Sequence, residues 1–211
     1  MEPLTSLIEE VLATARQVVD SGVLSLSGHG NVSIYSPERG LFAYTAAPTL
    51  RGIGPSAIVT VDLDGGVLSG TLPPLSRGAV DMHRTAYRER PGLGCVIHTH
   101  SPFATAYAVA GRPIECWVEP LSIFGMEDGV PVVPYAERGS PAAMEAIAAG
   151  MADGARAVLL QSHGILAFGE TGPAAVQVST LVEEAAQLGI NAEALGGVTL
   201  LPGAGTARRR V

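Results

Sequence analysis

The pattern of apolar and polar residues predicts a helix followed by two hairpins. Near the start of the chain, apolar side chains recur every three or four positions, which predicts a helix over roughly residues 5–22. Two strand patterns, at 31–35 and 41–45, predict a first hairpin. The alternating stretch 58–70 turns at Asp64-Gly65-Gly66 and predicts a second hairpin.

The rest of the chain alternates between strand and helix patterns. This order indicates an α/β layered domain with a mixed, mainly antiparallel sheet. Proline is favoured in the first turn of a helix, so Pro141 is expected to open one. Helices are also predicted at about 78–88, 102–110 and 173–194. Strands are predicted at 94–100 and 130–135. The segment 155–169 holds two apolar runs, which are separated by Ser162-His163-Gly164.

Composition and charge narrow the class of protein. The 211 residues suit one domain, expected at 1–196, with a Gly-rich, Arg-ended tail at 197–211. With 47% apolar and 16% charged residues, the chain is not of the disordered class. No apolar run approaches the ~20 residues of a membrane helix, and the acidic N-terminus is unlike a secretory signal. Two cysteines give no disulfide framework, so we expect a cytoplasmic protein. The net charge of -7 argues against a nucleic-acid partner.

The chain contains no lysine, because all 13 basic residues are arginine. This absence excludes mechanisms that need a lysine amine, such as Schiff-base aldolases, pyridoxal-phosphate enzymes and Walker-A nucleotide sites. Carbonyl chemistry in this protein would therefore need a different electron sink.

Three histidines stand where strands are predicted to end. His98 and His100 are two residues apart, so their side chains are expected on one face, and His163 follows the first apolar run of 155–169. Three imidazoles of this kind can hold a catalytic divalent ion with one position open. Hydrogen-bonded histidines at strand ends, with no metal, are the alternative that the pattern leaves open.

Three stretches of the chain are informative together: SGHGNVS (27–33), RERPGLGCVIHTHSPFATAYA (88–108) and AVLLQSHGILAFG (157–169). They make the sequence resemble the class II aldolase/epimerase superfamily, which includes fuculose-phosphate aldolase and ribulose-phosphate 4-epimerase. The resemblance implies a three-layer α/β/α domain and a homotetramer with active sites at subunit interfaces. It also implies Zn²⁺, or alternatively Mn²⁺ or Fe²⁺, on His98, His100 and His163.

The sequence departs from the family at its usual catalytic acid, which would stand 19 residues before His98, where this chain has Ala79. Asp81 is the nearest acid, but two helical residues correspond to a rotation of about 200°, so it faces away unless the helix register shifts. Glu119 is the second candidate acid, near the position of an active-site tyrosine in the aldolases. Apolar neighbours in its segment would raise the pKa of this carboxyl.

The substrate contacts are only partly those of the family. Asn31 and Thr45 match positions that contact a substrate phosphate, and His29 is assigned to the substrate pocket. Arg77 and Gly78 stand where the family has serines. Because a guanidinium binds a carboxylate through two hydrogen bonds, Arg77 points to a substrate that carries a carboxylate or a differently placed anion.

The predicted function is therefore a divalent-metal-dependent carbon–carbon lyase, of aldolase or decarboxylase type. Its substrate would be a small hydroxy-keto or hydroxy-carboxylate compound that reacts through a metal-stabilised enediolate. Two alternatives remain: a non-heme iron oxygenase of the same fold, and a relative that has lost catalysis.

Overall fold

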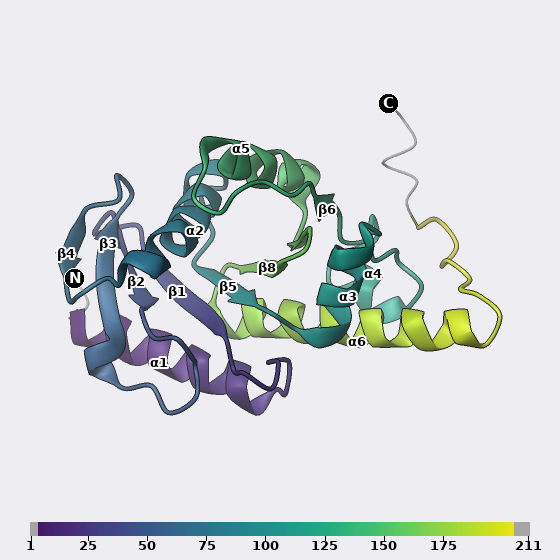
Figure 1. Ribbon diagram of the computed structural model, residues 1–211, viewed down its shortest axis with the longest axis horizontal. Helices are drawn as coiled ribbons and strands as arrows, with labels where there is room; N and C mark the ends of the chain where they lie inside the picture. The colour runs from purple at the N-terminus through teal and green to yellow at the C-terminus, as the bar shows by residue number, and fades with distance from the viewer. Residues whose placement is uncertain (1–3, 205–211) are drawn as a thin grey trace.

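An eight-stranded sheet forms the middle layer of the computed structural model, which describes residues 4–204 (Figure 1). The strand order is β4-β3-β2-β1-β5-β8-β7-β6. Every neighbouring pair is antiparallel except β6 and β7, which confirms the predicted mixed, mainly antiparallel sheet. The strands are β1 Gly30–Ser36, β2 Leu41–Thr45, β3 Ile58–Asp62, β4 Val67–Ser69, β5 Cys95–Thr99, β6 Val132–Val133, β7 Ala157–Leu160 and β8 Gly164–Gly169.

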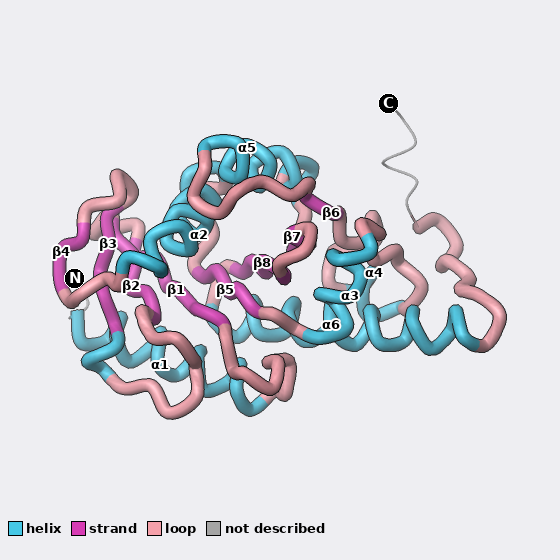
Figure 2. Tube along the Cα trace, viewed as in Figure 1, coloured by secondary structure: helices cyan, strands magenta, loops and turns pink. Residues whose placement is uncertain are grey.

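Helices cover both faces of this sheet, so the predicted three-layer architecture is confirmed (Figure 2). Helices α2 and α5 pack against each other on one face. Helices α1 and α6 pack against each other on the opposite face, together with α3. The helices are α1 Leu4–Asp20, α2 Arg77–Glu89, α3 Pro102–Ala110, α4 Glu119–Ile123, α5 Pro141–Gly150 and α6 Gly172–Ala194, with short 3₁₀ turns at Pro55–Ala57, Pro74–Ser76 and Ala152–Gly154.

Strand β5 separates the apolar cores on the two faces. Val96 belongs to the core beneath α2 and α5, whereas Cys95 and Ile97 belong to the core beneath α1. Because side chains alternate along a strand, His98 lies on the same face as Val96. The candidate ligand therefore faces the α2–α5 layer.

The element boundaries differ from the predicted ones mainly at short segments. The strand expected within 130–135 is only Val132–Val133, because Pro131 and Pro134 on either side have no N–H to donate to a ladder. Helix α4 was not predicted; with five residues it is too short for a periodic pattern. Both hairpins are confirmed, since β1 pairs with β2 and β3 pairs with β4.

The first part of the expected tail lies against the domain. Leu201 donates its backbone N–H to the Cys116 carbonyl, and Leu201 and Ala204 pack on the core beneath α3 and α6. Arg208–Arg210 lie outside the described residues. Among the residues that the structure describes, no helix combines the length and the apolar character needed to cross a membrane.

Candidate active site

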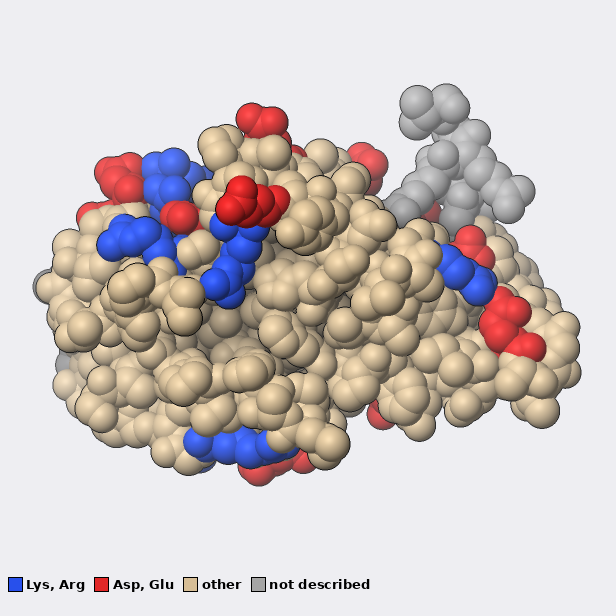
Figure 3. Space-filling model, viewed as in Figure 1, with Lys and Arg blue, Asp and Glu red and all other residues tan. Residues whose placement is uncertain are grey.

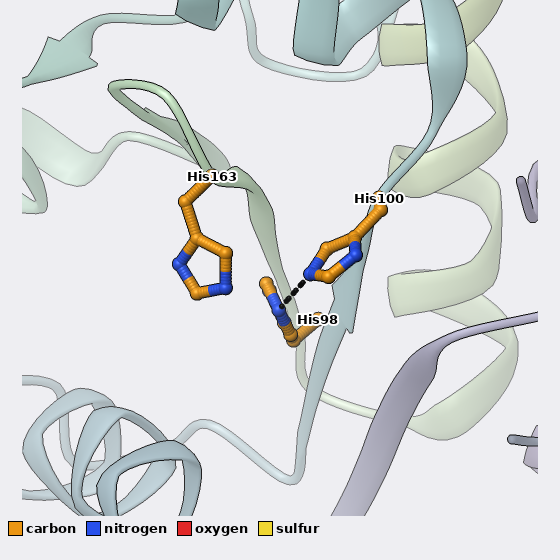
Figure 4. Close-up of side chains that lie close together, drawn as sticks. All are labelled: His98, His100 and His163. Atoms are coloured by element: carbon orange, nitrogen blue, oxygen red, sulfur yellow. Dashed lines mark hydrogen bonds between the residues drawn. The ribbon is translucent and has the colours of Figure 1, made fainter. Parts of the chain in front are cut away.

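The three histidines lie close together where β5 ends and β8 begins (Figure 4). His98 lies near the end of β5, opposite Asn31 of β1 and Leu166 of β8. His100 follows the end of the same strand, and His163 lies in the turn between β7 and β8. One ligand atom from each imidazole lies within 4.8 Å of the other two.

Hydrogen bonding sets the tautomer of His98. Its Nδ1 lies 2.8 Å from the carbonyl oxygen of Ile165, which can only accept, so Nδ1 carries the proton. The Nε2 lone pair therefore faces the other two imidazoles, and this nitrogen is 3.1 Å from Nε2 of His100. In metal-binding histidines, the ring nitrogen that does not bind the metal usually donates its N–H to such a carbonyl, which fixes the orientation of the ring.

The three imidazoles favour their neutral form, which is the form that binds metals. Burial, followed by the charges of His163 and His100, lowers the pKa of His98 well below its ordinary value. Burial and the charge of His100 lower the pKa of His163 to about 4. The pKa of His100 is also lowered, by burial first and then by His29 and Arg138. These residues fit a divalent ion with a nitrogen donor set.

The turn that carries His163 is tight, and it depends on a glycine. The His163 N–H donates to the Leu160 carbonyl at 3.0 Å, and Ser162 adopts a left-handed φ of 59°. A Cβ on Gly164 would lie 2.4 Å from the carbonyl oxygen of Thr99 and 2.9 Å from Cδ2 of His100. Only glycine lets the start of β8 approach the end of β5 this closely.

A cavity of about 530 Å³ opens in front of the histidines. Its lining contains the three histidines and two of the predicted substrate residues, His29 and Asn31. The predicted position of the missing acid, Ala79, also lies in this lining, as do Tyr44, Ser76, Met82 and Arg138. A second cavity, of about 270 Å³, shares Met82, Arg138 and His163 with the first and is otherwise lined mainly by residues of the β6–α5 segment.

A buried chain of hydrogen bonds orients Asn31. Nε2 of His83 lies 2.6 Å from Oδ1 of Asn31, and Nδ1 of the same ring lies 2.7 Å from the Ser33 hydroxyl. Burial lowers the pKa of His83 to about 3, so the ring is neutral and its Nε2–H donates to Asn31. The amide nitrogen of Asn31 is consequently the end that can donate to a ligand in the cavity.

Four predicted site residues do not reach the cavity lining of this chain. Thr45 is buried, and its hydroxyl accepts from the Val32 N–H at 2.9 Å. Asp81 pairs with Arg84 at 3.0 Å, because α2 starts at Arg77 without the register shift that Asp81 would need. Arg77 is exposed at the start of α2, and Glu119 is exposed at the start of α4.

Arg138 is a charged lining residue that the sequence analysis did not identify. It lies in the loop between β6 and α5, a segment with no motif in the sequence. The loop reaches the site because α5 packs against α2, and this contact is not encoded in any local pattern. Tyr135 of the same loop is 69% exposed and lines the smaller cavity.

Charges on the drawn face form small separate groups of both signs (Figure 3). Over the described residues, that face shows no continuous basic surface of the kind that binds a nucleic acid.

Comparison with known proteins agrees with this geometry. The sequence profile of the class II aldolase and adducin N-terminal domain matches residues 9–190. A 5-deoxy-D-ribulose 1-phosphate aldolase from Bacillus thuringiensis serovar kurstaki is 32% identical over 195 residues, which cover 92% of this chain and 89% of the relative. A 3-oxo-tetronate 4-phosphate decarboxylase from Escherichia coli O6:H1 is 30% identical over 186 residues, 87% of this chain and 85% of the relative.

A solved L-fuculose 1-phosphate aldolase has the same fold, with a TM-score of 0.82 at 28% identity over 94% of this chain and 91% of that one. Fold, histidine cluster and relatives together define an enzyme of the metal-dependent lyase class, of aldolase or decarboxylase type. The chain belongs to the class II aldolase and adducin N-terminal domain family.

Proposed function

We propose that this lyase holds Zn²⁺ on His98, His100 and His163, with Mn²⁺ or Fe²⁺ as alternatives. The observation that supports this proposal is the convergence of three neutral imidazoles within 4.8 Å at the wall of a cavity. When bound, such an ion supplies a Lewis acid that withdraws electrons from a substrate carbonyl. It would thereby take the place of the lysine iminium, which this chain cannot form.

The proposed substrate is a small hydroxy-keto or hydroxy-carboxylate compound that carries an anionic group. Asn31 would donate its amide N–H to the substrate from one side of the cavity, and His29 would contact it from the loop before β1. The ring of His29 lies 6.1 Å from that of His100, centroid to centroid, so both can reach one small molecule.

Within the lyase class, we favour decarboxylation. Aldol cleavage needs a base to remove the proton from the substrate hydroxyl, whereas the loss of CO₂ from a β-keto acid needs no such base. Neither cavity has an Asp or Glu among its described lining residues. A relative named for a decarboxylase reaction, at 30% identity, is consistent with this choice.

Aldol cleavage is the second candidate, and His29 is the observation that favours it. An imidazole in the cavity can act as the base in place of the carboxylate missing at Ala79. The relative at 32% identity is named an aldolase of a phosphorylated deoxyketose. Release of CO₂ or of an aldehyde from the same panel of substrates distinguishes the two reactions.

The predicted catalytic role of Glu119 depends on contact between subunits. Glu119 lies on α4, away from the cavity lining of its own chain, so a catalytic role would need the cavity of a second subunit. We propose a homotetramer of a cytoplasmic enzyme, with small molecules as its partners. We assign no catalytic role to Asp81, whose carboxylate is paired with Arg84.

The test is elemental analysis of the purified protein beside the His98→Ala and His163→Ala variants. We expect about one zinc ion per chain in the native protein, loss of metal in both variants, and unchanged far-UV circular dichroism. The Asp81→Ala variant is the matched control and should keep its metal. Normal metal content in the histidine variants would contradict the ligand assignment, and iron with O₂ uptake would favour the oxygenase alternative.

A further inference from the structure

Arg138 stands at the junction of the two cavities. It lines both of them, as do Met82 and His163 among the described residues. Its positive charge is one of the causes that lower the pKa of His100 and of His163, which reflects its position beside the histidine cluster. The guanidinium therefore borders the space where a substrate would meet the histidines.

Small residues on α2 make room for this arginine. A Cβ on Gly78 would lie 3.0 Å from Cγ of Arg138 and 3.2 Å from the backbone nitrogen of Gly139. The next residue, Ala79, lines the larger cavity together with Arg138. The small residues Gly78 and Ala79 thus leave space beside the methylene groups of Arg138.

Arg138 is exposed, and no acidic side chain pairs with it among the residues that the structure describes. Among the described residues, the ion pairs join Arg84 to Asp81, Arg88 to Asp64 and Arg112 to Glu193, and none involves Arg138. Both cavities lack an acid in their described lining, and the histidines there favour their neutral form. A guanidinium without a partner in such a cavity attracts an anion.

We propose that Arg138 is the anion-binding residue of this site and that it pairs with a carboxylate or phosphate that the substrate keeps during the reaction. A group lost as CO₂ is a poor partner, because pairing would stabilise the carboxylate more than the transition state. This inference rests on the proposed function only in taking the histidine cavity as the substrate site. It assigns to Arg138, in the loop between β6 and α5, the anion contact that the sequence assigned to Arg77.

Calorimetric titration of the zinc-loaded protein tests the proposal. The probes are tartronate, a small hydroxy-dicarboxylate, and inorganic phosphate, each titrated into the wild type and three variants. We expect Arg138→Gln to weaken binding of the recognised probe at least tenfold and Arg138→Lys to weaken it less, because lysine keeps the charge but cannot bind through two hydrogen bonds. Arg16→Gln makes the same charge change at an exposed position of α1 and should bind like the wild type.

Each outcome decides the proposal. Loss of tartronate binding alone identifies a carboxylate as the partner, and loss of phosphate binding alone identifies a phosphate. Equal binding by Arg138→Gln and wild type, or no binding of either probe by the wild type, overturns the proposal. If Arg138→Gln misfolds, Arg138→Lys alone decides, and equal binding by that variant and the wild type overturns the proposal.

Metal content is measured on every sample, which separates this proposal from the proposed function. Full zinc with unaltered anion binding in Arg138→Gln would refute the role of Arg138 and leave the lyase assignment intact. No zinc in the wild type would refute the metal assignment, and titration of that metal-free protein would still report whether Arg138 binds the anion.

Discussion

His83 orients Asn31, a residue of the cavity wall, through a hydrogen bond. Its neutral ring joins Asn31 of β1 to Ser33 of the same strand, and Ser33 is also 2.7 Å from the Tyr87 hydroxyl. The ring is fully buried on α2, so any change of its charge affects both the fold and the orientation of Asn31. In the sequence, His83 is only one position of the helix predicted at about 78–88.

The depressed pKa of His83 predicts an acid-sensitive fold. Burial lowers this pKa from 6.5 to about 3 in the folded state, so between these pH values the unfolded chain binds a proton that the native ring does not. The free energy of unfolding therefore falls as the pH drops below 6.5, by up to ~1.4 kcal/mol per pH unit for this group. Urea unfolding between pH 7.5 and 4.5 measures the slope.

The matched variant for this prediction is His83→Gln. It keeps a side-chain donor for Asn31 and removes the titration, so its stability should depend on pH less steeply than that of the wild type. The other histidines are common to both proteins and cancel in the comparison. An identical slope in the two proteins would contradict the assignment.

At the level of elements, the turn between β7 and β8 brings the third ligand to the end of β5. Leu159 of β7 pairs with Ile165 of β8, which in turn pairs with Thr99 of β5, so any displacement of the turn moves His163 relative to the other two histidines. The relative positions of the three histidines therefore depend on three strands and not on one sequence motif.

Gly164→Ala tests this dependence. The added Cβ would overlap the carbonyl oxygen of Thr99, so β5 and β8 must separate at the site, and we expect zinc affinity to fall about tenfold or more. Competition with a chromophoric chelator measures the affinity. Gly54→Ala is the control, since its Cβ would meet nothing within 4 Å and its φ of -127° suits alanine; equal losses in both variants would contradict the prediction.

The start of α3 is the second element that supports the site, because it follows His100 directly. Both carboxylate oxygens of Glu183 on α6 accept from its first turn, from the N–H groups of Phe103 and Ala104 at 2.9 and 2.8 Å. Glu183→Ala leaves these donors without a partner, so we expect a loss of ~1–2 kcal/mol in the free energy of unfolding. Thermal and urea unfolding measure it, with exposed Glu184→Ala as the control; a similar effect of both substitutions would contradict the prediction.

At the scale of the whole molecule, α3 and α4 lie beside α6 (Figure 1), and each of the three helices carries an exposed apolar side chain. Val109 is 63% exposed, Ile123 70% and Leu188 49%. Apolar groups this exposed on neighbouring elements are typical of surfaces buried between subunits. Glu119 starts α4 beside them, which is consistent with a role across an interface.

We therefore expect light scattering to give a mass about four times the chain mass of 21.6 kDa. Ile123→Glu should lower this mass, because it places a charge in the proposed interface. Leu68→Glu, at a side chain 56% exposed on the edge strand β4, should leave the mass unchanged. A monomeric wild type would refute the tetramer.

Much of this molecule follows from local sequence. Apolar periodicity located the long helices and the two hairpins, because burial of one face of an element is a local pattern. The histidines could be grouped from their positions at strand ends, since strand geometry dictates where alternate side chains point. The resemblance to the class II aldolases then indicated the three-layer fold, which the structure and the relatives confirm.

Only the tertiary structure decided what surrounds the histidines. Thr45 and Asp81 were candidates from sequence position, but a backbone N–H and an arginine hold their side chains elsewhere. Arg138 entered the cavity from a loop without a motif, through the packing of α5 on α2. Charges in a pocket depend on which distant segments meet there, and no local pattern of residues contains that information.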